Sequence, residues 1–203
     1  KKNRKPVAKP GKRHFYTDTN YYLLGLIIES IMKKPFHEAV HEMIFEPLGM
    51  ENAYIHGYSE PKTMVQYPPA HIYLYNINLI NDKRIAQIDY SGGGVVAPLN
   101  EYLFFMKALV SGQLVKNETL DKMINDDVKM GFPAVGFDYG YSIWKPKVIP
   151  LLMPKKYFCW GCVGVTGAFM FYHPETEAYV IGNFNDKSYT SKALRFMLME
   201  VIK

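Results

Sequence analysis

A tyrosine and a carboxylate lie two residues apart, at Tyr16 and Asp18, shortly before an apolar run that begins at Leu23. The turn after Pro10 and Gly11 can present the phenol of Tyr16. A phenol has an unperturbed pKa near ~10, so Tyr16 can act as a base only where a neighbouring ammonium favours the phenolate or relays the proton. Asp18 could orient that ammonium, or it could accept N–H bonds at a helix start. The residues alone leave both a catalytic phenol and a packed ring beside a helix cap open.

The spacing of apolar residues predicts the elements that would position this pair. Asp18 or Thr19 is expected to cap the first helix. Helices are predicted over residues 20–33, 35–45, 98–111 and 190–202, with a short helix from residue 117, and strands over residues 141–144, 157–160, 168–172 and 179–183. Residues 72–79 alternate and predict a short hairpin. Helices followed by strands and a closing helix predict an α+β fold, with an antiparallel sheet, flanking helices and a helical region.

The chain divides into three parts on this reading. Residues 1–15 form a basic arm, residues 16–135 a helical region with loops, and residues 136–203 the strands with the C-terminal helix. Most of the formal net charge of +5 comes from the arm, which could bind an anionic partner or be a solvated loop. No nucleic-acid motif accompanies the arm, and no apolar run approaches the ~20 residues of a transmembrane helix. Nucleic-acid binding and membrane spanning are therefore not predicted.

Three stretches carry a family resemblance: residues 10–53 with Tyr16-Thr17-Asp18, the glycine-rich residues 91–102, and residues 161–167, which read Gly-Cys-Val-Gly-Val-Thr-Gly. The first stretch closely resembles the serine β-lactamase and penicillin-binding-protein superfamily, nearest its class C and esterase-like branch. The second is similar to the same family, and the third resembles it more loosely. The resemblance implies a serine hydrolase that acts on β-lactams, D-alanyl peptides or esters through an acyl-enzyme. It implies no cofactor, a small-molecule or peptide substrate, and a periplasmic, extracellular or membrane-anchored location.

The same resemblance assigns roles to individual residues. Tyr16 would be the base that works with a lysine on the nucleophilic serine, and the backbone N–H of Val165 would be the second oxyanion donor. Gly164 would let substrate approach the backbone closely. Cys162 stands where the family carries lysine or histidine, and Val163 where it often has serine or threonine. The groups that grip a substrate carboxylate are thus absent, which favours ester or amide hydrolysis or a non-catalytic binding module on the same fold.

The nucleophile of this family is a serine in a Ser-x-x-Lys motif upstream of the tyrosine, and no serine precedes Tyr16 here. We therefore expect this chain to be the C-terminal portion of a longer hydrolase, inert alone, whose missing N-terminal segment is its partner. Two Ser-x-x-Lys matches do occur, at residues 30–33 and 59–62. The first lies late in a predicted helix and the second in a proline-broken loop, so both are predicted to be surface features.

A second pattern offers a different chemistry. His37-Glu38-Ala39-Val40-His41 matches the His-Glu-x-x-His motif of zinc peptidases, in which two imidazoles share a helix face. Glu60 falls at a spacing that some of these enzymes use for a third ligand, but Pro61 disfavours a helix there. The imidazoles are expected to face solvent, opposite an apolar stripe of the same helix that comprises Phe36, Val40, Met43 and Ile44.

The two cysteines, Cys159 and Cys162, flank Trp160 and Gly161 as in a redox motif. No helix follows them, and an extended strand holds Cα atoms three residues apart at ~10 Å, too far for a disulfide. Free thiols in or beside a strand are predicted.

Overall fold

The computed structural model describes residues 5–6, 8–9, 11–12, 14–63, 68–74, 76–80, 89–129, 136–147 and 155–201. The first half is mainly helical, with two small two-stranded sheets. Its elements are α1 (Asp18–Met32), α2 (Phe36–Val40), the π-helical turn η1 (His41–Phe45), β1 (Tyr54–Ile55), β2 (Tyr73–Leu74), β3 (Ile77–Asn78), β4 (Val95–Val96), α4 (Leu99–Val110) and α5 (Asn117–Asn125).

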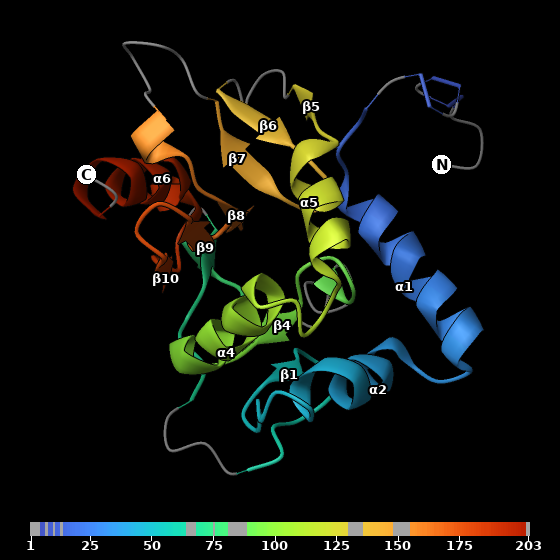
Figure 1. Cartoon of the computed structure of the whole chain (residues 1–203). Coiled ribbons are helices and arrows are strands. Elements are labelled where there is room, and N and C mark those ends of the chain that lie inside the picture. Colours follow the sequence, from blue (N-terminus) through green and yellow to red (C-terminus); the bar gives the residue numbers. More distant parts are fainter. Residues whose placement is uncertain are drawn as a thin grey trace.

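The second half forms an antiparallel sheet of six strands in the order β10-β9-β8-β7-β6-β5 (Figure 1). These are β5 (Val128–Lys129), β6 (Phe137–Tyr139), β7 (Trp144–Pro146), β8 (Trp160–Val163), β9 (Ala168–His173) and β10 (Ala178–Asn183). The short helical turn η2 (Lys155–Tyr157) precedes β8. The turn η3 (Lys187–Tyr189) precedes the helix α6 (Thr190–Phe196), and η4 (Met197–Val201) continues α6. The α+β fold with an antiparallel sheet is confirmed.

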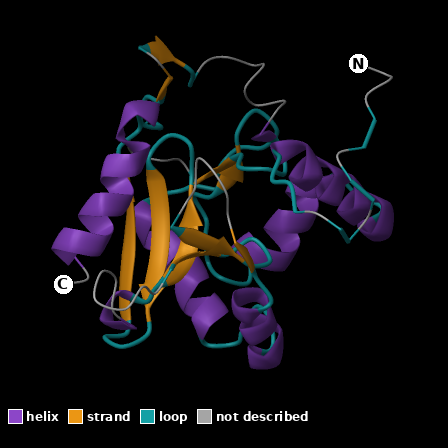
Figure 2. Cartoon of the chain, turned by 90° about the horizontal axis from the view of Figure 1, so that it is seen from above, coloured by secondary structure: helices purple, strands orange, loops and turns teal. Residues whose placement is uncertain are grey.

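Helices cover both faces of this sheet (Figure 2). On one face α6 and η4 pack on β9 and β10, where the buried residues are Cys159, Phe169, Phe171, Val180, Ala193, Met197 and Leu198. On the other face α4 and α5 pack around Met106, Leu120, Ile143 and Trp160. A third core lies in the helical region and joins η1, β1 and the loop before β4. Within the described residues, no helix is both long and apolar enough to cross a membrane.

The long periodic elements match their predictions. The helices α1, α4, α5 and α6, the β2–β3 hairpin, and the strands β9 and β10 lie where the sequence placed them. The helix cap is different, because Thr17 is the N-cap of α1 and no side chain caps it, so the prediction of Asp18 or Thr19 is wrong. The division into three parts stays a prediction, and much of the basic arm lies outside the described residues.

Two predicted strands are shifted. The stretch predicted at residues 141–144 is mostly a turn, in which Ser142 has φ +62°, and β7 begins only at Trp144. The stretch predicted at residues 157–160 begins in the helical turn η2, and β8 starts at Trp160. Both predictions start too early because aromatic residues have a high β-propensity wherever they stand, and this propensity does not indicate which residue pairs with a neighbouring strand.

The predicted buried stripe of the second helix is wrong at Met43, which is 58% exposed. The helix changes to π-helical geometry at His41, where the N–H of Glu46 donates to the carbonyl of His41 at 2.9 Å. A π-helical turn contains more residues than an α-helical turn, so it rotates the following side chains away from the expected face. Phe45 takes the buried position instead, at 3% exposure.

Candidate active site

Tyr16 lies in the extended segment just before α1, and its position is fixed by the first turn of that helix. The N–H of Asn20 donates to the carbonyl of Thr17 at 3.0 Å, and the side-chain amide of Asn20 donates to the carbonyl of Phe15 at 3.1 Å. Tyr16 is 39% exposed, so its phenol is partly accessible to solvent. The helix start therefore holds a phenol that solvent can reach.

Three aromatic rings surround that phenol. The rings of Tyr21, Tyr139 and Trp144 lie 5.8, 5.7 and 6.1 Å from the ring of Tyr16. The hydroxyls of Tyr21 and Tyr139 are hydrogen-bonded to each other, and the hydroxyl of Ser142 donates to that of Tyr21 at 3.3 Å. The sequence did not predict this cluster, because Tyr139, Ser142 and Trp144 reach Tyr16 only through long-range packing. High aromatic content was its one signal.

The surroundings of Tyr16 favour its protonated form. Burial raises the pKa of Tyr16 to about 12, with smaller contributions from the charge of Asp18 and from Tyr21. Burial also raises the pKa of Asp89, and the charge of Asp18 adds to this effect. Tyr16 is therefore a neutral phenol at pH 7 unless a cation is brought beside it, because a nearby positive charge lowers a phenol pKa.

The strand β8 forms a second wall next to Tyr16. It pairs with β9 along its whole length, but with β7 at one position, Trp144 opposite Gly161. The N–H of Gly164 donates to Ala168 of the β9 side at 2.8 Å. Since N–H groups alternate between the two edges of a strand, the N–H of Val163 points to the β7 side, where no described strand pairs with it. Within the described residues, this end of β8 is an open edge.

The side chains of β8 divide between the two faces of the sheet. The thiol of Cys162 lies close enough to Tyr16 and Tyr102 to raise the pKa of both phenols slightly, whereas burial is the largest cause in each case. Val163 points to the opposite face and packs against the core below α6. Of the predicted substrate-binding side chains, Cys162 therefore faces the Tyr16 site, and Val163 can offer only its backbone there.

A tight turn follows β8 and carries Val165. The N–H of Gly167 donates to the carbonyl of Gly164 at 3.2 Å, and Gly167 has φ +80°. The hydroxyl of Thr190, at the start of α6, donates to the carbonyl of Val165 at 2.7 Å. The backbone of Val165 is thus held from both sides while its side chain is 58% exposed. A fixed, exposed backbone segment of this kind can present an N–H to a ligand.

The glycine-rich turn at residues 91–94 lies against α1 and helps to hold it. The hydroxyl of Ser91 donates to the carbonyl of Tyr21 at 3.0 Å. A Cβ on Gly25 would lie 2.5 Å from the Cβ of Ser91, and a Cβ on Gly92 would lie 3.6 Å from the carbonyl oxygen of Asp18. The absence of a side chain at Gly25 therefore lets the turn and the helix approach closely, whereas a side chain at Gly92 would make only an ordinary contact.

The two cysteines are free thiols, as predicted. Burial raises the pKa of the Cys162 thiol to about 11 and that of the Cys159 thiol to about 12. Cys162 is therefore uncharged at neutral pH.

The zinc alternative finds no geometric support. Across the described residues, which include His37, His41 and Glu60, no three His, Cys, Asp or Glu side chains are grouped so as to hold a metal ion. The ring of His37 lies 6.2 Å from that of Tyr58 and 6.4 Å from that of Tyr90, and its Nδ1 is buried. The expectation that both imidazoles face solvent is therefore wrong for His37.

The first Ser-x-x-Lys match lies too far along α1 to serve Tyr16, and the serine and lysine of the second are engaged in local contacts. Ser30 lies about 18 Å along α1 from Asp18, from the helical rise per residue. The hydroxyl oxygen of Ser59 accepts the N–H of Ile55 at 2.9 Å, and the ammonium of Lys62 lies 3.6 Å from the carboxylate of Glu46.

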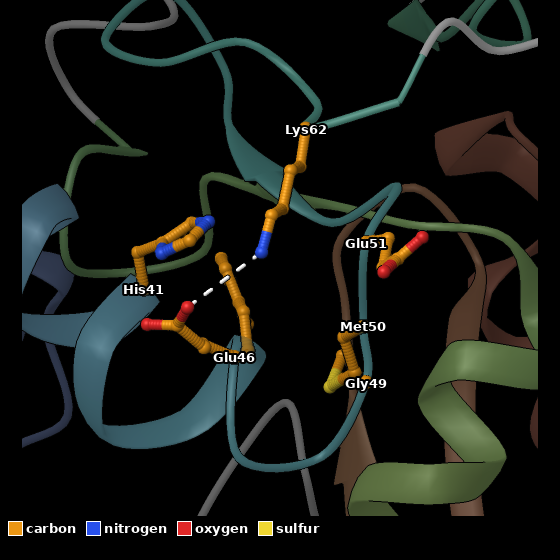
Figure 3. Close-up of a pocket in the computed structure, with 7 residues that line it drawn as sticks. His41, Glu46, Gly49, Met50, Glu51 and Lys62 are labelled. Carbon is orange, nitrogen blue, oxygen red and sulfur yellow. Dashed lines mark ion pairs between the residues drawn. The ribbon is translucent and has the colours of Figure 1, made fainter.

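Lys62 and Glu46 line a small pocket beside η1, shown in Figure 3. Its volume of about 30 Å³ accommodates water but no substrate. The pocket contains none of the residues around Tyr16. Its lining residues are His41, Phe45, Glu46, Gly49, Met50, Glu51 and Lys62. We assign it no catalytic role.

Comparison with known proteins identifies the fold and the family. The chain is similar to a D-stereospecific amidohydrolase from Streptomyces sp. (TM-score 0.72, 21% identity, covering 97% of this chain and 58% of that one). It is also similar to a D-amino acid amidase from Ochrobactrum anthropi SV3 complexed with D-phenylalanine (TM-score 0.69, 17% identity, covering 92% and 58%).

A curated relative is the "Putative D-alanyl-D-alanine carboxypeptidase" of Escherichia coli (strain K12), 45% identical over 42 residues, or 21% of this chain and 10% of that protein. The chain spans 58% of the length of each of the two solved structures named above. The family model described as Beta-lactamase matches residues 2–201. The resemblance read from the sequence is confirmed: the chain belongs to the Beta-lactamase family.

Proposed function

We propose that this chain supplies the proton-transfer residue and one binding wall of a serine hydrolase that works through an acyl-enzyme. The observation that carries this proposal is the approach of Tyr16 to the open end of β8, where Cys162 lies. The two groups come from segments about 145 residues apart in sequence, and the fold brings them to one place. A partly exposed phenol beside an unpaired strand edge can both move a proton and bind an extended substrate.

In the proposed reaction, Tyr16 takes the proton of the nucleophilic serine as its oxygen attacks the carbonyl carbon. The proton then passes to the leaving amine or alcohol, and a water repeats the sequence to release the acyl group. The N–H of Val165 donates to the oxyanion that forms on the carbonyl oxygen. Asp18 orients the cation that lowers the pKa of Tyr16. This pKa, about 12 in the described structure, must fall for the phenolate to form near neutral pH.

The serine and this cation come from a segment outside residues 1–203 in our proposal. Of the two Ser-x-x-Lys matches within the chain, Ser30 lies about 18 Å along α1 from Asp18, and the hydroxyl of Ser59 accepts the N–H of Ile55. The similarity to structures of which this chain covers 58% supports a longer protein. Residues 1–203 alone are then inert, because the phenol has no nucleophile to deprotonate.

The substrate we propose is an amide or ester without a carboxylate next to the scissile bond. Cys162 occupies the place of a family cation, and its thiol is neutral because burial raises its pKa to about 11. The carboxyl of Asp18 lies close enough to Tyr16 to raise the pKa of the phenol, and it would repel a substrate carboxylate. The similarity to an amidohydrolase and an amidase supports this choice over a D-alanyl peptide with a free carboxyl terminus.

The test is Tyr16→Phe in the native-length protein, assayed with an amino acid amide and a nitrophenyl ester. Removal of the hydroxyl is expected to lower kcat by about 10²- to 10⁴-fold, the usual contribution of general acid–base catalysis. Tyr54→Phe, in β1 of the helical region, is the matched control and should retain full activity.

An equal, small loss in both variants would show that Tyr16 only packs beside the helix. A kcat of Tyr16→Phe within about threefold of the parent, with a normal melting temperature, would contradict its role in proton transfer.

A further inference from the structure

His14 is a titratable residue of the basic arm that the proposed mechanism does not use. It lies two residues before Tyr16, and the centroid of its ring is 5.4 Å from that of Tyr139 in β6. The ring of Tyr16 lies 5.7 Å from the same Tyr139 ring. Phe15, between them in the sequence, is 54% exposed. His14 and Tyr16 therefore share one tyrosine neighbour, while most of Phe15 is in solvent.

The shared neighbour is a fixed one. Tyr139 is 7% exposed, and its hydroxyl is hydrogen-bonded to that of Tyr21 in α1. The ring centroids of His14 and Tyr16 can be no farther apart than 5.4 and 5.7 Å added together. At about 10 Å, a unit charge near the protein surface changes a pKa by about 0.3–1 unit. A charge on His14 is therefore close enough to change the ionisation of Tyr16.

The groups that already act on Tyr16 oppose its phenolate. Burial is the largest cause of its raised pKa, and the charge of Asp18 is the next. The titratable and charged groups of the arm and of the elements around the two rings are Lys12, Asp18, Tyr21, Tyr139 and Cys162. An imidazole changes from neutral to positively charged between about pH 8 and 5. His14 can thus bring a positive charge to a cluster in which Asp18 carries a negative one.

We propose that His14 is a positioning residue of the Tyr16 site, whose protonated imidazole favours the phenolate that accepts the proton of the serine. This inference rests on the proposed hydrolase function. While the pKa of Tyr16 is about 12, an imidazole loses its proton long before the phenol does, and the two do not couple. Once a cation from outside residues 1–203 lowers that pKa toward neutral, both groups titrate in one range and the charge of each affects the other.

The test is the pKa of Tyr16 in the native-length protein, followed by NMR of tyrosine labelled with carbon-13 at Cζ and assigned by the signal that Tyr16→Phe removes. His14→Lys keeps a positive charge, whereas His14→Gln is neutral. The pKa of Tyr16 is expected to be about 0.3–1 unit lower in His14→Lys than in His14→Gln. This difference should shrink in about 1 M salt, where the Debye length is about 3 Å. Equal pKa values in the two variants at low salt would overturn the proposal.

The pH profile of kcat/KM is the second readout. His14→Gln should move the limb on which activity rises with pH to higher pH, by about 0.3–1 unit, and His14→Lys should not. His41→Gln, in η1, is the matched control and should leave this limb unchanged. A loss of kcat of about 10²-fold or more at every pH in His14→Gln would overturn the proposal, because His14 would then carry the proton itself.

Failure of this inference is distinguishable from failure of the proposed hydrolase chemistry. If Tyr16→Phe is inactive and neither His14 variant changes the pKa of Tyr16 or the pH profile, the role of His14 alone is refuted. If Tyr16→Phe retains its activity, the proposed proton transfer is refuted as well.

Discussion

Replacing Gly161 with alanine should strongly destabilise the wall that faces Tyr16. A Cβ at Gly161 would lie 2.7 Å from the Cα of Phe171 and closer still to the carbonyl oxygen of Met170, both on the neighbouring strand β9. Both atoms belong to the backbone, so no side-chain rotation can relieve the clash. The strands must separate, which adds an overpacking cost of about 1–3 kcal/mol to the loss of one or two ladder hydrogen bonds at about 1 kcal/mol each. The expected loss of unfolding free energy is about 2–5 kcal/mol.

The assay is urea unfolding followed by tryptophan fluorescence, because Trp160 precedes Gly161 and Trp144 pairs with it. Gly93→Ala is the matched control, since an added Cβ there meets nothing within 4 Å in the described structure. The control should be neutral or slightly stabilising, as the unfolded chain loses freedom. Equal unfolding free energies for the two variants would refute the close packing of β8 on β9.

Three further predictions concern charge and protonation. Glu101→Gln should lower the free energy of unfolding in urea by about 1–3 kcal/mol, because the 2%-exposed carboxylate accepts hydrogen bonds from the backbone N–H of Asn52 at 3.0 Å and from the side-chain amide of Asn52 at 2.7 Å. Replacing the exposed Glu118 with glutamine should leave the free energy of unfolding unchanged. Stability should fall as pH rises from about 9 toward 12, since the folded state raises the pKa of both Cys159 and Cys162 and so holds their protons longer than the unfolded state; the same unfolding free energy at pH 8 and pH 10.5 would contradict this. Cys162→Lys in the native-length protein should raise kcat/KM for carboxylate-bearing substrates at least about tenfold relative to neutral substrates, because a charge-assisted hydrogen bond contributes ~1.5 kcal/mol. An unchanged ratio of the two kcat/KM values would mean that this position does not meet the substrate.

The parts of the fold that the sequence predicted are those specified by local pattern. The helices α1 and α4 have long apolar periods, and β9 and β10 are continuous strands joined by the turn at Pro174. The three-residue strand β6 was not predicted, and β7 was predicted too early in the sequence. Pairing with a neighbour, and not local propensity, defines so short a strand.

The candidate site shows the same division. Tyr16 and the stretch from Cys162 to Gly167 could be found from residue type and family resemblance. The ring cluster of Tyr21, Tyr139 and Trp144 could not, because residues more than 100 positions apart meet there only in the folded chain. The neutral state of Tyr16 also depends on burial, which only the packed structure reveals.

The most direct test of the central claim is to map the adduct of a fluorophosphonate probe, which acylates activated serines, on the native-length protein. The proposed mechanism predicts one labelled serine, on a peptide outside residues 1–203, with labelling slowed in Tyr16→Phe and unchanged in Tyr54→Phe. A label on a serine within residues 1–203, or labelling that is indifferent to Tyr16→Phe, would contradict it.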